Sequence, residues 1–537
     1  MHIHLILAGG LFLTVLLSYI FQEKYIGKIS VKEYIIAATA SLLLLFWFMG
    51  HTGVLGSGYH FVDDHEIYTI GKDFLEYGFW GTMYKWITND LHSRFRFTYF
   101  LIRVTECYFF GDNFVLWHVF QTVTAAVSLF LSYVFARRMK CTVWVSYIFA
   151  VAIFIGGGQS AVWWRLGPQE NLGIILLMLT LLSLRSYVEK NKTSNLVLSI
   201  ILTVLLAGIK EAFLLLLPLL PIWVAYWEIS QNQKKISVQK ICLALKKRWI
   251  YFLVTYVVFA IDIAIILLYV GTNKIGYSGI DSSYRIRDYV TGVAEIVNGR
   301  LGLYIKISVI GIVFLLTPAW ILYIREQRKF WGFLNSMIIP ALLFGYFCGS
   351  QMILHVKSGM YERYLLPVTV AFAYFWLIDV YHFFESKKCF LSGYYMFTIF
   401  MALALITGVN DEERACIYAE DGKNTTAMLN YVAEHADENS NVVVGIGYEE
   451  DFSASVYLQE KCNINSTYNL FYSTRENNIV RDGYVCNENE RAAIALDEVQ
   501  IFIGYSHNIG RAMEEVGLSQ DDFEISTFGE YLLCVKR

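Results

Sequence analysis

The feature that most constrains this chain is a series of apolar runs, which recur from the first residues to about position 409. Each run is about 17–25 residues long, enough to cross a hydrocarbon core of about 30 Å as an α-helix. The apolar share of 56% exceeds the roughly 45–50% of soluble domains. We therefore expect a polytopic all-α membrane protein of about twelve transmembrane helices. The first run lacks a basic start and a cleavage site, so we expect a retained helix rather than a signal peptide. Length and hydropathy place the spans at about 3–21, 34–50, 113–135, 142–158, 170–187, 194–209, 211–228, 249–271, 302–324, 332–349, 364–384 and 391–409.

The positions of Lys and Arg indicate the sidedness of these spans. Basic connections come at every second gap and are cytoplasmic by the positive-inside rule; they include QEKYIGKISVKEY, ARRMK, QNQKKISVQKICLALKKR and REQRKF. The intervening gaps are then outside, together with the amino terminus and everything beyond about residue 410. We expect a multi-pass protein of the plasma membrane with this orientation.

The chain changes character after residue 409. Residues 410–537 hold 24 acidic and 9 basic side chains, whereas the whole chain holds 46 and 43. The short segments NVVVGIG, VQIFIGY and YLLCVKR favour strands, and they alternate with helix-like TTAMLNYVAEHA and IGRAMEEVGL. The sequence thus predicts a transmembrane domain, 1–409, and a small extracytoplasmic acidic α/β domain, 410–537.

Two features of the acidic domain leave alternatives open. Its four cysteines, Cys416, Cys462, Cys486 and Cys534, permit a disulfide if the outside is oxidising, or they are free thiols. The segment YEEDFSAS follows a predicted strand, where α/β domains often bind ligands, although solvated acids are the simpler interpretation. Elsewhere, no GxxxxGK[ST] segment, zinc-finger spacing or repeat supports nucleotide hydrolysis or nucleic-acid binding.

The first large outer loop, residues 51–112, contains the segment YHFVDDHEIY, with Asp63 and Asp64 adjacent. Crowding two carboxylates raises the pKa of one of them, and a bound cation reverses that effect, so the pair suits a general base. The flanking segments YTIGKDFLEYGFWGTMYKW and RFRFTYFLIRVTECYFFG mix aromatic and charged residues, which predicts helices at the membrane interface. A solvated loop is the alternative interpretation.

The other outer gaps supply cations. Lys or Arg at membrane depth usually has a partner or a polar cavity, and phosphate is a natural partner. Each cation alone could snorkel to the headgroups, but as a set on one face they predict a phosphate site. Glu170 and Glu211 are expected to orient these cations through ion pairs. The cations are Arg165, Lys210, Arg300, Lys357 and Arg363.

The order of these motifs resembles the GT-C superfamily of polytopic glycosyltransferases, which use polyprenyl-phosphate sugars and include protein O-mannosyltransferases and the lipid A aminoarabinose transferase. VDDHEIYTIGKDFLEYGF is similar to the acidic motif of that family, and WRLGPQENLGIILLMLTLLSL to its Pro-Glu turn. AGIKEAFLLLLPLLP follows, and YERYLLPVTVAFAYFW is similar to its Arg-Tyr-x-x-Pro helix start. The resemblance covers about residues 50–384.

The resemblance implies an enzyme that moves a sugar from a polyprenyl-phosphate donor to an extracytoplasmic acceptor, which would be a cell-surface glycan, a lipid or a protein of the cell envelope. Asp63 would act as general base and Asp64 would orient it. Lys210, Lys357 and Arg363 would bind the donor phosphate, with Arg165 and Arg300 behind them. Inversion at the anomeric carbon is implied in the same way. The content of Ile, Lys, Tyr and Phe is compatible with a bacterial host.

Several departures from the family pattern leave questions open. The chain carries an additional amino-terminal span, unless the first apolar run is not a span. Its second motif acid is Asp64 rather than the commoner Glu, and the acidic domain matches no module of the family. His60 and His65 could ligate a divalent cation with the aspartates, but their spacing is not diagnostic, so no cofactor is certain.

Functions of other classes also fit a bundle of this kind. A transporter or lipid-linked glycan flippase would need ionisable groups inside spans, and Asp262 is the conspicuous one. A polysaccharide polymerase would place key arginines in large outer loops without the early acidic motif. A sensor or structural protein with an acidic ectodomain is the non-enzymatic alternative.

Overall fold

The computed structural model describes most of the chain. The described residues are 29–154, 157–231, 238–270, 286–288, 290–291, 294, 330–355, 362–380, 382, 390–437, 440–446, 448–464, 467–468, 471–473, 478–480, 493–494, 498–507, 509–515 and 517–537.

Two compact units make up the chain, and each is described by itself. Unit 1 comprises Met1–Trp47, Lys85–Leu101 and Gln121–Glu413, and unit 2 comprises Phe48–Tyr84, Ile102–Phe120 and Arg414–Arg537. The helices that contribute residues to both units are α2 (Val31–His51), α3 (His65–Asp90), α4 (Phe97–Phe110), α5 (Phe114–Arg138) and α19 (Phe390–His435).

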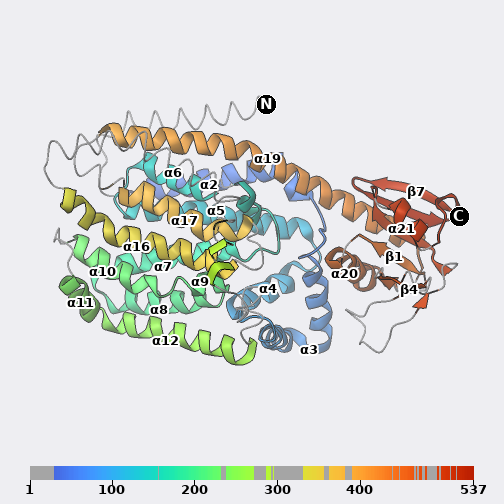
Figure 1. Cartoon of the computed structure of the whole chain (residues 1–537), viewed down its shortest axis with the longest axis horizontal. Helices are drawn as coiled ribbons and strands as arrows, with labels where there is room; N and C mark the ends of the chain where they lie inside the picture. Colours follow the sequence, from blue (N-terminus) through green and yellow to red (C-terminus); the bar gives the residue numbers. More distant parts are fainter. Residues whose placement is uncertain are drawn as a thin grey trace. The chain divides into compact units, whose positions relative to one another are not determined.

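Unit 1 is helical where the structure describes it. Asn191 ends α7 (Glu170–Lys190) in a left-handed conformation (φ 51°), and its N–H donates to Tyr187 O at 2.9 Å, so the chain turns sharply into α8 (Thr193–Ala207). α7 packs against α8 and α10 (Leu219–Gln231), and α8 also packs against α12 (Trp249–Ile265) (Figure 1). The remaining elements of unit 1 are α6 (Val143–Phe154), η3 (Gly157–Trp163), α7 (Glu170–Lys190), α8 (Thr193–Ala207), α9 (Glu211–Leu214), α10 (Leu219–Gln231), α11 (Val238–Lys247), α12 (Trp249–Ile265), η4 (Ile266–Val270), α16 (Phe330–His355), η7 (Glu362–Leu365), α17 (Leu366–Tyr374) and η8 (Phe375–Val380).

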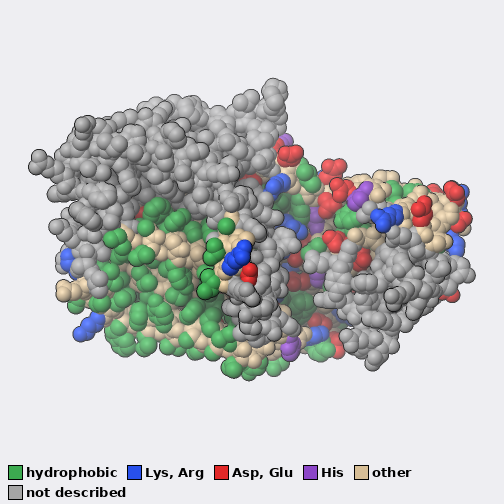
Figure 2. All heavy atoms as spheres, viewed as in Figure 1, with side chains coloured by type: hydrophobic (Ala, Val, Ile, Leu, Met, Phe, Trp, Pro, Cys, Tyr) green, Lys and Arg blue, Asp and Glu red, His purple; other side chains and the backbone are tan. Residues whose placement is uncertain are grey.

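Many of the described helices are suited to a bilayer. Five are long and apolar enough to cross it, namely Val31–His51, Phe114–Arg138, Glu170–Lys190, Trp249–Tyr269 and Ile338–His355. Apolar side chains cover the outward surface where Figure 1 places α8, α10 and α12 (Figure 2). The chain is therefore a multi-pass membrane protein. The number of twelve spans stays a prediction, because the spans predicted at 3–21 and 302–324 lie outside the described residues.

The span predicted over residues 211–228 is broken in the structure. α9 ends at Leu214 and α10 begins at Leu219. Pro218 lies in this break, and proline cannot continue a helix because it lacks an N–H and its ring clashes with the carbonyl four residues earlier. Pro221 lies in the first turn of α10, where proline is tolerated. The break leaves Glu211 at the head of a short separate helix.

The segment predicted to be the first outer loop is largely helical, as the sequence predicts. α3 is kinked at Gly78 (φ 64°, ψ 178°), and α4 follows it. The ring centroid of Tyr108 lies 5.7 Å from that of Phe74 and 5.1 Å from that of Phe79, while Trp80 is largely exposed. These helices carry the aromatic surface expected of interfacial segments, and their location at the membrane interface stays a prediction.

The carboxyl-terminal part of unit 2 contains the predicted strands in a mixed sheet. The continuous apolar runs of β1 and β6 are buried, as expected for strands covered on both faces. β1 is parallel to β2 and β6, with Val443 opposite Phe502, and β8 is antiparallel to β6 and β7, with Cys534 opposite Phe502 and Ile525. The sheet order is β2 (Thr467–Tyr468), β1 (Val442–Gly445), β6 (Ile501–Tyr505), β8 (Tyr531–Lys536) and β7 (Phe523–Phe528).

Shorter elements complete unit 2. They are η2 (Val54–Gly56), α20 (Tyr448–Val456), η9 (Tyr457–Lys461), α21 (Ile509–Glu515) and η11 (Gln520–Asp522), with a separate sheet of β3 (Phe471–Ser473), β4 (Asn478–Val480) and β5 (Ala493–Ile494).

The core of unit 2 joins the first outer loop to the carboxyl-terminal segment. Tyr59, Phe61 and Tyr68 belong to one buried apolar cluster with residues of α19, β1, α20, β6 and β8. Most of the loop predicted to belong to the transmembrane domain thus forms a compact unit with the acidic segment. The functional division at residue 409 stays a prediction.

The cysteines of the acidic segment are unbridged where they are described. Cys416, Cys462 and Cys534 form no disulfide with one another, and Cys486 lies outside the described residues. The choice between a disulfide and thiols therefore stays open for the acidic segment as a whole.

Candidate functional site

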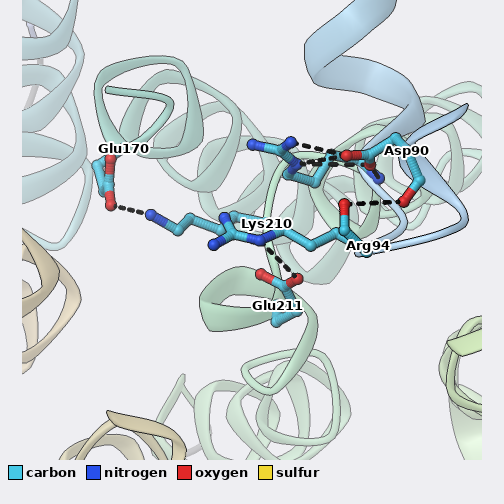
Figure 3. A network of polar contacts seen from close by, with 7 residues as sticks. Asp90, Arg94, Glu170, Lys210 and Glu211 are labelled. Atoms are coloured by element: carbon cyan, nitrogen blue, oxygen red, sulfur yellow. Dashed lines mark hydrogen bonds and ion pairs between the residues drawn. The ribbon is translucent and has the colours of Figure 1, made fainter. Parts of the chain in front are cut away.

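A buried pair of opposite charges lies where α9 meets the start of α7. Lys210 is 3% exposed and Glu170 is 1% exposed, and the lysine Nζ donates to Glu170 Oε1 at 2.6 Å (Figure 3). The Lys210 Nζ also lies 4.3 Å from the centroid of the Tyr364 ring, a cation–π contact. The structure thus places Glu170 beside one of the predicted cations, and the orienting role of Glu170 stays a prediction.

Two glycines allow the backbone segments of this cluster to approach each other. A Cβ on Gly173 of α7 would lie 2.1 Å from the Phe213 ring of α9, and a Cβ on Gly208 would lie 2.4 Å from the Phe97 ring. The Thr98 N–H donates to Gly208 O at 2.9 Å. These contacts hold α9 against α7 and bring the segment before α4 alongside Lys210.

That segment contributes two arginines. Arg94 Nε lies 4.0 Å from Glu211 Oε1, and both side chains are buried (Figure 3). Arg96 donates to Asp90 Oδ1 from Nε at 3.1 Å and from Nη2 at 2.7 Å. Burial opposes the charge of Arg96, but the Asp90 carboxylate more than offsets this and raises the pKa of Arg96 above its ordinary value.

The far side of the cluster is formed by the end of α16 and by η7. The His355 ring stacks on Tyr364 with centroids 4.5 Å apart, and the Arg363 guanidinium lies 5.3 Å from the same ring centroid. Gln351 Nε2 donates to Ala212 O at 2.8 Å. Lys210 and Arg363, which the sequence assigned to one phosphate site, therefore contact the same tyrosine.

Two buried acceptors in the cluster have unused capacity. Glu170 Oε2 and Gln351 Oε1 have no hydrogen-bond donor among the residues that the structure describes. Buried polar atoms normally have a partner. The cluster can therefore accept two further hydrogen bonds, from water or from the hydroxyl groups of a ligand.

The other predicted cations are placed in part. Arg165 is partly exposed and follows η3, which packs against η7. Its side chain makes no ion pair with another described residue. Arg300 and Lys357 lie outside the described residues.

The acidic motif lies in unit 2, at the amino end of α3. Asp64 is 2% exposed and accepts a hydrogen bond from the His60 N–H at 2.9 Å, whereas Asp63 is partly exposed. Val62 has a φ of 79°, a conformation that β-branched residues rarely adopt. Both carboxylates lie at a helix amino terminus, whose dipole stabilises negative charge.

Ser453 of α20 anchors this motif from the carboxyl-terminal segment. Its Oγ accepts from the Val62 N–H at 2.8 Å and lies 3.1 Å from His65 Nδ1, and its carbonyl accepts from the Tyr59 hydroxyl at 2.8 Å. Burial, and next the Asp64 carboxylate, raise the pKa of Tyr59 well above its ordinary value, so this hydroxyl remains a donor. The acidic loop is therefore positioned by residues almost 400 positions away.

The two histidines of the motif are occupied by packing contacts. His60 stacks on Tyr418 with ring centroids 3.6 Å apart, and its Nδ1 lies 3.8 Å from Asp421 Oδ2. His65 faces Ser453 and the ring of Phe452. Within the described ranges, no three His, Cys, Asp or Glu side chains gather as metal ligands. The structure thus gives no geometric support to the metal site considered for His60 and His65.

Several residues of these sites were not singled out by the sequence. The segment HSRFRF, in which charged and aromatic residues alternate, could have indicated Arg94 and Arg96. Such a pattern is compatible with buried charged side chains as well as with an amphipathic helix. No local pattern pointed to the remaining ones. They are Asp90, Gln351, His355, Tyr364, Tyr418, Asp421 and Ser453.

Comparisons with known proteins complete the description of the site. No protein-family model matches the sequence, and no curated protein matches it. The chain is similar to the solved structure of ArnT from Cupriavidus metallidurans in the apo state, with 10% identity and a TM-score of 0.43, over 94% of this chain and 98% of that one. It is also similar to the oligosaccharyltransferase of Archaeoglobus fulgidus, with 11% identity and a TM-score of 0.43, over 91% of this chain and 71% of that one. At these values the likeness is remote, and no residue role is carried over from it.

Proposed function

We propose that this chain is an integral membrane glycosyltransferase that moves a sugar from a polyprenyl-phosphate donor to an extracytoplasmic acceptor. The observation that carries the proposal is the buried cluster of Lys210, Glu170, Arg94 and Glu211 at the ends of apolar helices. Removing charges from water is expensive, and a buried ion pair is often no better for stability than apolar side chains. Ionisable groups kept among membrane helices are therefore a functional-site hypothesis by default.

The cluster is suited to an anionic leaving group. In the proposed reaction an acceptor hydroxyl oxygen forms a bond to the anomeric carbon while the bond from that carbon to the donor phosphate oxygen breaks. The electron pair stays on the polyprenyl phosphate, so negative charge develops there. Lys210, with Arg94 and Arg363, would stabilise that charge, and the carboxylates of Glu170 and Glu211 would hold the cations in place before the reaction.

The hydroxyl proton must also be accepted. We assign this role to Asp63, which is partly exposed, and an orienting role to Asp64, which is buried and bonded to the backbone of His60. Lys357, Arg165 and Arg300 are further candidates for the phosphate site. The acceptor would be a glycan, lipid or protein of a bacterial cell envelope.

Transfer of labelled sugar from a panel of polyprenyl-phosphate donors tests the proposal. Purified wild type in detergent should release polyprenyl phosphate and label an acceptor. Lys210→Met should lower the transfer rate about 100-fold or more, the scale seen when one charge-stabilising group is removed from an active site. Asp63→Asn should lower it by about 100-fold or more as well, the scale of a lost general base. Lys423→Gln, at an exposed lysine of α19, is the matched control and should transfer at the wild-type rate. A chelator arm tests for a divalent cation. Full activity of a folded Lys210→Met protein would refute the phosphate assignment.

Asp262 favours a second candidate function, that of a lipid-linked glycan transporter. This carboxylate lies within the candidate span Trp249–Tyr269 and is buried, and its Oδ2 has no hydrogen-bond donor among the described residues. Ionisable groups of this kind mark ion or substrate pathways in transporters. A transporter would move the labelled lipid-linked sugar across a vesicle membrane without releasing polyprenyl phosphate, and it would depend on Asp262 rather than on Lys210.

A further inference from the structure

The short helix α11 lies directly before a membrane span and has a basic outward face. Its apolar residues Ile241, Ala244 and Leu245 pack against Ala225 and Ile229 of α10. The opposite face is therefore directed away from the bundle. In the sequence, no Asp or Glu occurs between Glu228 and Asp262, whereas six Lys and Arg side chains lie between residues 234 and 248.

Arg248 holds α11 in place at its junction with α12. The guanidinium donates to Glu228 Oε2 from Nη2 at 2.8 Å and from Nε at 3.1 Å, and it also bonds to Asn191 in the turn between α7 and α8. Its carbon Cζ lies 4.4 Å from the centroid of the Tyr187 ring. The turn between α7 and α8, with its exposed Lys190 and Lys192, thus adjoins the end of α11.

Apolar and cationic side chains alternate on this outward surface. Leu243 is 66% exposed and Trp249 is 56% exposed. Leu243 is followed three and four positions later by the exposed Lys246 and Lys247, which share its side of the helix. Figure 2 shows Lys and Arg side chains beside apolar ones at the edge where Figure 1 labels α11.

The acids near this surface are already paired. Glu228 binds Lys247 and Arg248, and Glu189 binds Arg138 and Arg185. Lys190, Lys192 and Lys246 have no acidic partner among the described residues. We define these three lysines, with Lys247, as the basic surface of unit 1. Its net charge is positive, because only Lys247 of the four is paired with a carboxylate.

We propose that the basic surface, together with Leu243 and Trp249, binds the headgroups of anionic phospholipids in the leaflet where α12 enters the membrane. Trp249 begins a candidate span, so the surface lies at headgroup level whichever side of the membrane it faces. Tryptophan favours that level, and cations beside a span attract anionic lipids. An exposed leucine between lysines suits contact with acyl chains just below the phosphates. The inference stands independently of the proposed glycosyltransferase activity.

Native mass spectrometry of the full chain in detergent tests the proposal. The measured quantity is the ratio of association constants for dioleoyl phosphatidylglycerol and dioleoyl phosphatidylcholine. The wild type should prefer the anionic lipid, and the preference should weaken as salt is raised. Lys190→Gln/Lys246→Gln should lower the preference by roughly fivefold per lysine, about 25-fold in all.

Two controls make the result decisive. Lys423→Gln/Lys536→Gln removes the same charge from exposed positions in unit 2 and should keep the preference. Lys190→Arg/Lys246→Arg keeps the positive charge at the surface and should also keep the preference for the anionic lipid. This variant separates the effect of lost charge from the effect of misfolding. The proposal is overturned if the wild type binds both lipids equally or if Lys190→Gln/Lys246→Gln retains the preference for the anionic lipid. It is also overturned if the unit 2 control loses as much of that preference as Lys190→Gln/Lys246→Gln does.

Discussion

Replacing Lys210 by methionine should separate the stabilising role of the buried pair from its chemical role. Lys210 Nζ and Glu170 Oε1 are 2.6 Å apart, a separation at which the Coulomb attraction is about 6 kcal/mol for an effective dielectric constant of 20. Desolvation offsets much of this. Removing one partner of a buried pair leaves the other charge uncompensated, so we expect Lys210→Met to lower the free energy of unfolding by about 3–5 kcal/mol.

The double variant Lys210→Met/Glu170→Met should recover most of that loss, because apolar side chains of similar volume often replace a buried pair without net cost. Sugar transfer should stay about 100-fold or more below the wild-type rate in both the single and the double variant, since neither has the cation. Lys247→Met is the matched control. Its lysine is 55% exposed and its partner Glu228 keeps Arg248, so the loss should be below about 1 kcal/mol.

Unfolding in mixed micelles, followed by tryptophan fluorescence, measures the stability of each variant, and the labelled-donor assay measures its activity. If Lys210→Met is as stable as the wild type, Glu170 is not left as a buried uncompensated charge. The argument that the pair stabilises the fold would then fail. Recovery of transfer in the double variant would mean that the cluster is structural, and the phosphate-binding role would have to be abandoned.

Two further predictions concern other parts of the structure. Burial raises the pKa of Glu106 in α4 from 4.5 to about 7, so its contribution to stability is full below about pH 4.5 and is lost as the pH rises through 7. Glu106→Gln should therefore stabilise the protein at pH 8, by at most about 3 kcal/mol because the side chain is partly exposed. At pH 4.5 the same substitution should have little effect on the free energy of unfolding. Equal effects at both pH values would contradict a raised pKa of Glu106. Gly173→Ala should push Phe213 away and lower both stability, by about 1–3 kcal/mol, and sugar transfer. Gly345→Ala, where a Cβ meets nothing within 4 Å, is the control, and indistinguishable melting temperatures for the two alanine variants would rule out the steric argument.

The elements of the fold were predictable where local patterns decide them. The β-branched and apolar runs that became β1, β6 and β8 are too short for helices and too apolar for loops, so their type follows from their length and their β-branched residues. The break between α9 and α10 was missed because hydropathy averages over Pro218, whereas the backbone responds to that single residue.

The candidate site was predictable only in part, because its members meet through tertiary contacts. The sequence indicated that Glu170 and Glu211 orient cations, but not that Arg94 is the partner of Glu211. That pairing depends on Gly208, which lets Phe97 approach. The roles of Asp63, Asp64 and the phosphate-binding cations stay predictions until the transfer assays are made.

The anchoring of the acidic loop on Ser453 has a consequence for how the chain is made. Tyr59 and Ser453 are 394 positions apart, so at about 5–20 residues per second the ribosome needs on the order of 20–80 s to supply the partner of the loop. During that time Tyr59, Phe61 and Tyr68 lack the apolar cluster that later covers them. The loop can reach its final form only after the end of the chain has been synthesised, which makes its assembly a late step in biogenesis. A chain truncated after α19 would insert its preceding helices but would leave the Asp63 and Asp64 segment without its support.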